Sequence, residues 1–381
     1  MKKFDINRRK FLKSAMLAGV GGISAPKVFS MENGVGKMSV DDGLAAKISK
    51  CRTLGSGKSA MKVSAIGFGC MGMTYNRSSH PGKQECIKLI RNAVERGVSL
   101  FDTAIIYGPF NNEELVGEAL EPFRGNVLAS TKFGHEIVNG KGTGRQDSRP
   151  ETIKRYCDDS LRRLRTDCIE LFYQHRFDPT VPIEDVAGTI GELIKAGKVR
   201  RWGLCEVGVD IIRKAHAVQP LTAVQSEYHI MWRAVENNGV LNLCEELGIG
   251  FVPYSPLNRG FLGGNINEYT VFDKNNDNRQ SLPRFTHKAI RSNLRIVEIL
   301  NKFGRERGMT SSQISLAWLL SRSPVIFPIP GTTKISHLEE NLRSLEFSIS
   351  IKDWKMLESE ISKIPVVGDR YNAEQQRQIR G

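Results

Sequence analysis

The stretch "KQECIKLIRNAVERGVSLFDTA", residues 83–104, contains one helix followed by one strand. Its apolar residues recur at helical spacing, and Gly97 ends that pattern. The residues that follow, 99–104, are a short run that is mostly apolar, as expected for a strand buried on both faces of a parallel sheet. This stretch therefore predicts an α/β fold in which helices and strands alternate.

The same pattern repeats along the chain. Strands are expected to start near residues 63, 99, 127, 169, 200, 222, 249 and 325, with helices between them. Eight such units over about 300 residues predict a closed (β/α)8 TIM barrel rather than an open, doubly wound sheet. The long polar connection at 257–287 leaves the end of the seventh strand, on the face where barrels build active sites. We expect one catalytic domain over residues 52–381, preceded by a linker at 31–51.

Four ionisable side chains stand at the carboxyl ends of expected strands, namely Asp102, Tyr107, Lys132 and His175. Each alone has an ordinary structural explanation, but in a barrel all four meet at one mouth. A lysine ammonium lowers the pKa of a neighbouring tyrosine, an aspartate balances the lysine, and a neutral histidine donates a hydrogen bond to a carbonyl oxygen. The set therefore predicts protonation of the alkoxide that forms when hydride reaches a carbonyl carbon.

The ordered motifs "GFGCMG", "FDTA", "TKFG", "QHR", "YSPL" and "IPGTTKISHLEENL" resemble those of the aldo-keto reductase superfamily, over about residues 52–371. The resemblance implies NADP(H)-dependent reduction of an aldehyde or ketone, with NAD(H) as the alternative cofactor. It implies that Tyr107 is the general acid, that Lys132 and Asp102 tune it, and that His175 orients the carbonyl.

The resemblance also implies a cofactor site. Gln225 would hold the nicotinamide amide, Tyr254 would stack on its ring, and Lys334 is the fixed charge nearest to a 2′-phosphate. Cysteine is a weaker donor than the serine usual at position 205. The residues implied to contact the cofactor are Gly69, Cys70, Met71, Cys205, Glu206, Gln225, Tyr254, Ser255, Leu257, Arg259, Gly331, Thr332, Lys334, His337, Glu340 and Asn341.

Three alternatives compete with this interpretation. "GFGCMG" matches the dinucleotide-binding pattern G-x-G-x-x-G, but a loop, "MTYNRSSHPG", follows it where that motif requires a helix. A metal-dependent hydrolase on the same barrel would want an H-x-H pair, which the seven histidines do not form, so no metal is expected. A non-catalytic or very slow nicotinamide-binding subunit that senses redox state or assembles with a partner stays open.

Residues 1–30 have the composition of a targeting segment. "NRRKFLK", residues 7–13, resembles a twin-arginine export signal, and the glycines of "LAGVGGISA" disfavour a stable helix in a soluble domain. We therefore expect the twin-arginine translocase as a partner of the precursor. The mature chain is expected to start near Met31 in the periplasm of a Gram-negative bacterium, or to stay in the cytoplasm if the signal is not used.

Composition narrows the remaining classes of partner. The 381 residues are 40% hydrophobic and 25% charged, as in ordinary globular proteins. The net charge is +14, but lysines and arginines lie beside acids without a basic stripe or binding motif, so no nucleic-acid partner is expected. The chain has no apolar run of about 18 residues, so no stable membrane anchor is expected. The expected ligand is a small carbonyl compound.

Overall fold

The computed structural model describes residues 50–377 and residue 379. The expected signal segment, 1–30, lies outside this range, as does the expected linker except for its last two residues, Lys50 and Cys51. Cys51 already belongs to the first strand.

Seven parallel strands form one sheet in which every strand pairs with its neighbours along the chain. They are β3 (Phe68–Gly69), β4 (Leu100–Asp102), β5 (Leu128–Phe133), β8 (Leu171–Gln174), β9 (Trp202–Cys205), β10 (Ala223–Glu227) and β11 (Gly250–Tyr254). Because the order runs in one direction without reversal, the sheet is singly wound, and the doubly wound alternative is excluded.

The extended segment 325–330 closes the sheet into a barrel. The backbone N–H of Phe327 donates to the carbonyl of Phe251 on β11, at 2.8 Å. On the other side, the N–H of Gly67 donates to the carbonyl of Pro328, at 2.9 Å. Pro328 and Pro330 have no N–H to donate, and they pair only through their carbonyl oxygens, which accept hydrogen bonds. The segment therefore pairs with strands on both sides without forming a complete ladder. The predicted (β/α)8 barrel is confirmed.

The expected first strand is divided in two. Residues 61–64 form β2 (Met61–Ser64), which pairs antiparallel with β1 (Cys51–Leu54), and only β3 enters the barrel. Leu54 and Val63 of this hairpin belong to one buried cluster with Leu100 and Leu128, the first residues of two barrel strands. The hairpin therefore plugs the amino-terminal end of the barrel.

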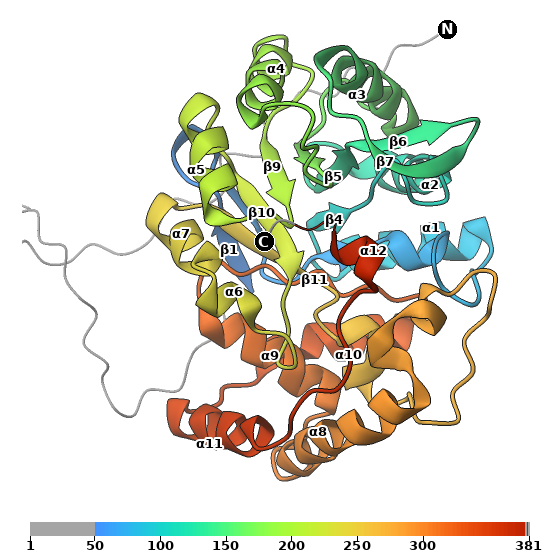
Figure 1. Cartoon of the computed structure of the whole chain (residues 1–381), viewed down its shortest axis with the longest axis vertical. Coiled ribbons are helices and arrows are strands. Elements are labelled where there is room, and N and C mark those ends of the chain that lie inside the picture. Colours follow the sequence, from blue (N-terminus) through green and yellow to red (C-terminus); the bar gives the residue numbers. More distant parts are fainter. Residues whose placement is uncertain (1–49, 378, 380–381) are drawn as a thin grey trace, which may run out of the picture. The chain divides into compact units, whose positions relative to one another are not determined.

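Helices surround the strands (Figure 1). They are α1 (Lys83–Glu95), α2 (Asn111–Leu120), α3 (Pro150–Leu164), α4 (Ile183–Lys195), α5 (Val209–Val218), α6 (Ala234–Asn237), α7 (Val240–Leu247), α8 (His287–Arg305), α9 (Ser311–Arg322), α10 (Ile335–Arg343), α11 (Ile351–Ser362) and α12 (Ala373–Gln376). Sequence periodicity did not predict α11, α12 or the hairpin of β6 (His135–Val138) and β7 (Lys141–Gln146). No helix in the range 50–377 is long and apolar enough to cross a membrane.

Alternation along the strands separates the barrel interior from the layer beneath the helices. On β4, Leu100 lies in the inner cluster and Phe101 in the outer one. On β8, Leu171 and Tyr173 point inward while Phe172 packs outward. Because side chains alternate at every residue, Asp102 and Lys132 share the inner face with Leu100 and Leu128 but lie nearer the carboxyl ends. The interior is therefore apolar at its base and ionisable at its mouth.

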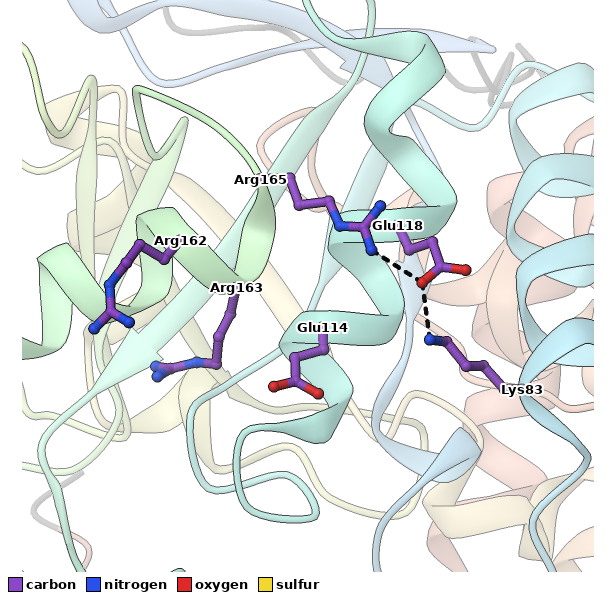
Figure 2. A pocket seen from close by; sticks show the side chains of 6 residues that line it. All are labelled: Lys83, Glu114, Glu118, Arg162, Arg163 and Arg165. Atoms are coloured by element: carbon purple, nitrogen blue, oxygen red, sulfur yellow. Dashed lines mark hydrogen bonds and ion pairs between the residues drawn. The ribbon is translucent and has the colours of Figure 1, made fainter.

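A separate hollow of about 310 Å³ lies on the outer surface between α1, α2 and the end of α3. Its charged groups largely neutralise one another: Glu118 pairs with Lys83 at 2.8 Å and with Arg165 at 3.1 Å (Figure 2). Arg163, which also lines this hollow, pairs with the buried Glu113 at 2.6 Å. The exposed pairs of Glu118 and the buried pair of Glu113 connect neighbouring helices, and we assign no chemistry to this hollow.

Candidate active site

Asp102 and Lys132 form a buried ion pair at the mouth of the barrel. The side chain of Lys132 is 0% exposed, and its ammonium donates to Asp102 and, at 2.8 Å, to the carbonyl of Thr103. Burial lowers the pKa of Lys132, but Asp102 and the surrounding groups outweigh burial, so the pKa lies above its ordinary value. Lys132 is therefore charged at neutral pH.

Two further side chains hold the aspartate in place. The hydroxyl of Ser130 donates to Asp102 Oδ2 at 2.8 Å, and Nε2 of Gln225 donates to the same oxygen at 2.9 Å. Asp102 and Ser130 are direct partners in the ladder between β4 and β5. The carboxylate thus has a fixed orientation, which fixes the ammonium beside it.

Tyr107 lies above this pair. The Lys132 Nζ atom is 5.1 Å from the centre of the tyrosine ring, and Tyr107 as a whole is 9% exposed. Burial raises the pKa of Tyr107 to about 12, although the Lys132 charge acts in the opposite direction. The sequence reasoning counted only the lysine and expected a lowered pKa. In the fold, burial has the larger effect, so the hydroxyl keeps its proton at neutral pH.

His175 stands edge-on to Tyr107, with ring centres 5.8 Å apart and ring planes at 85°. Burial, together with His135, Arg176 and Lys132, holds the pKa of His175 well below its ordinary value, so its imidazole is neutral. No hydrogen-bond partner for its Nδ1 atom is present among the described residues. The sequence reasoning missed His135, whose ring centre lies 4.7 Å from that of His175. Its position directly after the "TKFG" motif was the available signal.

A cavity of about 610 Å³ opens over these residues. Asp102, Tyr107 and His175 line it, while Lys132 lies fully buried beneath. The long connection at 257–287 contributes Leu257, Arg259, Gly260, Asn278 and Arg279 to its wall, so the prediction that this loop shares the face of the four ionisable residues is confirmed.

The structure brings most of the residues implied to bind a cofactor to this cavity, but not all of them. Those that line it are Gly69, Met71, Gln225, Tyr254, Ser255, Leu257, Arg259, Gly331, Thr332, Lys334 and His337. Those that do not line it are Cys70, Cys205, Glu206, Glu340 and Asn341. Cys70 and Cys205 are fully buried, and both carboxylate oxygens of Glu206 accept hydrogen bonds from Arg370, at 2.9 and 2.7 Å.

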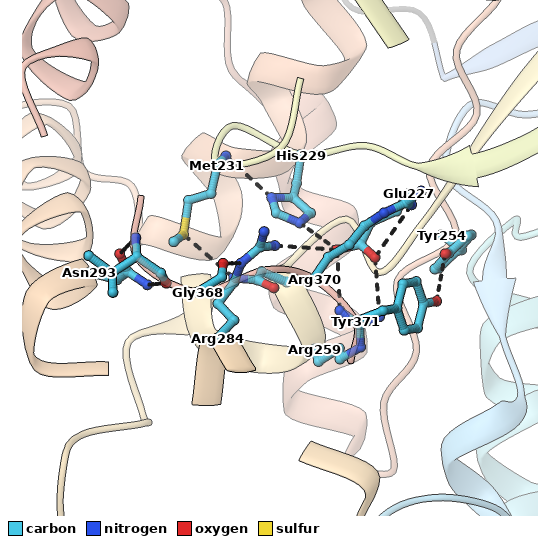
Figure 3. Close-up of polar contacts among 12 residues, drawn as sticks. Glu227, His229, Met231, Tyr254, Arg259, Arg284, Asn293, Gly368, Arg370 and Tyr371 are labelled. Carbon is cyan, nitrogen blue, oxygen red and sulfur yellow. Dashed lines mark hydrogen bonds and ion pairs between the residues drawn. The ribbon is translucent and has the colours of Figure 1, made fainter. Parts of the chain in front are cut away.

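The carboxyl-terminal segment forms part of the wall and is held by buried charges (Figure 3). Tyr371 lines the cavity, and its hydroxyl lies 2.7 Å from that of Tyr254 at the end of β11. Behind it, Glu227 accepts two hydrogen bonds from Arg259, at 3.2 and 3.1 Å, and lies 3.9 Å from Arg370. The closing segment "VVGDRY", residues 366–371, therefore contributes Tyr371 to the wall of the cavity.

Comparison with known proteins identifies similar chains and agrees with the fold. Residues 65–361 fit the Aldo/keto reductase family profile. The chain is 39% identical over 316 residues to a protein of Glycine max named "Probable aldo-keto reductase 1", covering 83% of this chain and 90% of that one. A glycerol dehydrogenase from Gluconobacter oxydans superposes with a TM-score of 0.75 at 25% identity, covering 82% of this chain and 96% of that one. An aldo-keto reductase from Klebsiella pneumoniae, solved with NADPH, gives a TM-score of 0.62 at 23% identity, covering 84% and 99%.

Proposed function

Because the chain belongs to the aldo/keto reductase family, a family of oxidoreductases, we propose that it reduces the carbonyl group of an aldehyde or ketone with NADPH. The observation that carries the proposal is the arrangement of a protonated Tyr107 above the buried Lys132–Asp102 pair and beside a neutral His175, in one cavity.

Each residue has a distinct part in the proposed reaction. The carbonyl oxygen accepts a hydrogen bond from the N–H of neutral His175, which orients it toward Tyr107. NADPH, when bound, supplies the hydride that reaches the carbonyl carbon. Tyr107 transfers its hydroxyl proton to the oxygen, and the Lys132 ammonium stabilises the phenolate that remains. Asp102 keeps the lysine charged and in place, and solvent returns the proton to Tyr107.

The lining of the cavity suits a bound dinucleotide. A Cβ atom added to Gly69 would lie 2.9 Å from the carbonyl oxygen of Ile329, and one added to Gly331 would lie 2.6 Å from the carbonyl oxygen of Gly69. Only glycine permits this close approach of two backbone segments. Arg259 and Lys334 supply positive charge for phosphates, and Tyr254 supplies a ring for stacking.

Replacement of Tyr107 by phenylalanine tests the proposal. Tyr107→Phe removes the transferable proton and should lower kcat for NADPH-dependent reduction of generic aldehydes by about 10²–10⁴-fold. NADPH binding, followed by fluorescence, should be retained. Tyr269→Phe is the matched control because Tyr269 is 80% exposed on the long loop. Wild-type turnover in Tyr107→Phe would contradict the assignment. A wild-type protein that binds NADPH but reduces no aldehyde would favour the non-catalytic nicotinamide-binding alternative.

We also propose that residues 1–30 direct export through the twin-arginine translocase to the periplasm. The support is the sequence "NRRKFLK" with the glycine-containing apolar stretch after it. That route carries folded proteins, so the barrel would close around its cofactor before crossing the membrane.

A further inference from the structure

Most of the charges that line the cavity are positive. Arg77, Arg176, Arg259, Arg279 and Lys334 line it, and Asp102 is the sole carboxylate among the described lining residues. That carboxylate is paired with Lys132. Arg259 is paired with Glu227 at 3.1 Å, and Arg279 with Asp277 at 2.5 Å. Within the described part of the chain, Arg77, Arg176 and Lys334 have no carboxylate within ion-pair distance.

Two of these three cations, Arg77 and Lys334, lie on other parts of the cavity wall than His175. Arg77 donates to Asn278 of the long loop at 3.3 Å. Burial, together with the charges of Arg279 and Arg259, lowers the pKa of Arg77 to about 9, which places it in the same cluster of positive charge. Lys334 lies in the 331–337 segment that lines the cavity. Lys334 matches a phosphate of the cofactor in the proposed function, and Arg77 lies close enough to Tyr107 for their charges to interact.

Arg176 lies at the reacting end, in direct contact with His175. It follows His175, and its Nη1 atom donates to the His175 carbonyl at 2.8 Å. Its charge lowers the pKa of both His175 and His135. The pKa of Arg176 itself is raised, despite burial, by Tyr371, Tyr254, Glu206 and Cys205, although Glu206 is not within ion-pair distance and is paired with Arg370. Arg176 therefore lies beside the histidine proposed to orient the carbonyl and the tyrosine proposed to stack on the nicotinamide.

The guanidinium of Arg176 has unused donors. It carries five N–H groups, and one hydrogen bond to a protein acceptor is formed within the described residues. A partly buried charge with free donors is stabilised by an anion, and the planar fork of arginine matches a carboxylate through two parallel hydrogen bonds. A single positive charge balances a singly charged carboxylate.

We infer that Arg176 binds a carboxylate of the substrate, so that the preferred substrates are carbonyl compounds that also carry a carboxylate. This inference rests on the proposed carbonyl reduction. A neutral aldehyde leaves the guanidinium without a directly bonded carboxylate, whereas an oxo-acid pairs with it and presents its carbonyl to His175 and Tyr107.

Matched pairs of aromatic aldehydes test the inference. For 2-, 3- and 4-carboxybenzaldehyde and the corresponding methylbenzaldehydes, kcat/KM is measured with saturating NADPH. In the wild type, at least one carboxyl compound should exceed its methyl counterpart by roughly ten- to hundredfold, the range of a charge-assisted hydrogen bond. The ring position of the preferred carboxyl group indicates how far the Arg176 guanidinium lies from the reacting carbonyl.

Variants assign the preference to a residue. Arg176→Gln should lower the carboxyl-to-methyl ratio of kcat/KM by roughly ten- to hundredfold, and Arg176→Lys should keep part of it. The ratio cancels general losses of activity. Lys334→Ala is the matched control: it should weaken NADPH binding while preserving the ratio. Equal kcat/KM for both members of all three pairs, or an unchanged ratio in Arg176→Gln, would overturn the inference while leaving the proposed reduction intact.

A binding measurement separates this inference from the proposed function. Calorimetry on the NADP⁺-loaded protein should show benzoate binding at least about tenfold more tightly than neutral benzamide, with the preference lost in Arg176→Gln. If the wild type reduces no aldehyde but shows this preference, the carboxylate site stands and the proposed reduction fails. Equal binding of benzoate and benzamide to the wild type refutes the site, whether or not Arg176→Gln folds.

Discussion

Glu227→Gln tests how strongly the buried charges behind the cavity stabilise the protein. Glu227 is fully buried and accepts hydrogen bonds from two nitrogens of Arg259 and, at 3.1 Å, from His229. Arg284 lies 3.6 Å away. Glutamine keeps the shape but removes the charge that balances these arginines. Breaking a buried ion pair costs about 3–5 kcal/mol, so we expect the free energy of unfolding to fall by that amount.

The effect depends on pH in a defined direction. Burial by itself raises the pKa of Glu227, but Arg259 and His229 outweigh burial and hold the pKa well below its ordinary value of 4.5. The charged carboxylate therefore stabilises the fold fully above pH 4.5, and this contribution is lost as pH falls below that value. The difference between wild type and Glu227→Gln should be largest near pH 7 and should shrink below pH 4.5.

Urea unfolding followed by tryptophan fluorescence measures both effects, because Trp232 packs against the buried network. The centre of its ring lies 4.9 Å from the guanidinium carbon of Arg370 and 5.5 Å from that of Arg284. Glu246→Gln is the matched control, since Glu246 pairs with Arg213 on the surface and should leave the unfolding midpoint nearly unchanged. If Glu227→Gln unfolds at the wild-type midpoint at pH 7, the buried network does not stabilise the fold as argued.

Two further predictions concern the cofactor and the amino-terminal segment. NADPH should bind more tightly than NADH, and Lys334→Ala should narrow that difference roughly tenfold by removing a charged partner of the 2′-phosphate; equal affinities of the wild type for both cofactors in a fluorescence titration would refute this role. Arg8→Lys with Arg9→Lys should leave the full-length precursor in the cytoplasm with its reductase activity intact, whereas native protein recovered from the cytoplasm with residues 1–30 still attached would contradict export.

The barrel and the order of its site residues were predictable from local patterns. Short apolar strands alternating with amphipathic helices favour parallel pairing, and parallel strands present their carboxyl ends on one face. Once Asp102, Lys132 and His175 were placed at strand ends, their convergence followed from this geometry. Tyr107, in the turn after β4, belongs to the same mouth.

Local patterns also misjudged particular elements. Residues 61–69 read as one apolar strand, yet the chain divides them between the plug hairpin and the barrel. Both parts are extended, so local sequence does not distinguish them. They differ in the strand with which each pairs, and that strand lies elsewhere in the chain. The hairpin of β6 and β7 was missed because five of the six residues of β7 are exposed and carry no core pattern.

The amino-acid sequence by itself predicted the barrel and the catalytic candidates, because each depends on residues close together in the chain, and motifs shared with a known family predicted part of the cavity lining. Only the tertiary structure decided that Tyr107 keeps its proton, that Glu206 is paired with Arg370, and that Arg176 has donors free to bind a ligand. Glu206 and Arg370 are 164 positions apart, and no spacing rule connects them. Burial and the balance of charge in a site are sums over neighbours from many segments, so they are set only when the chain is folded.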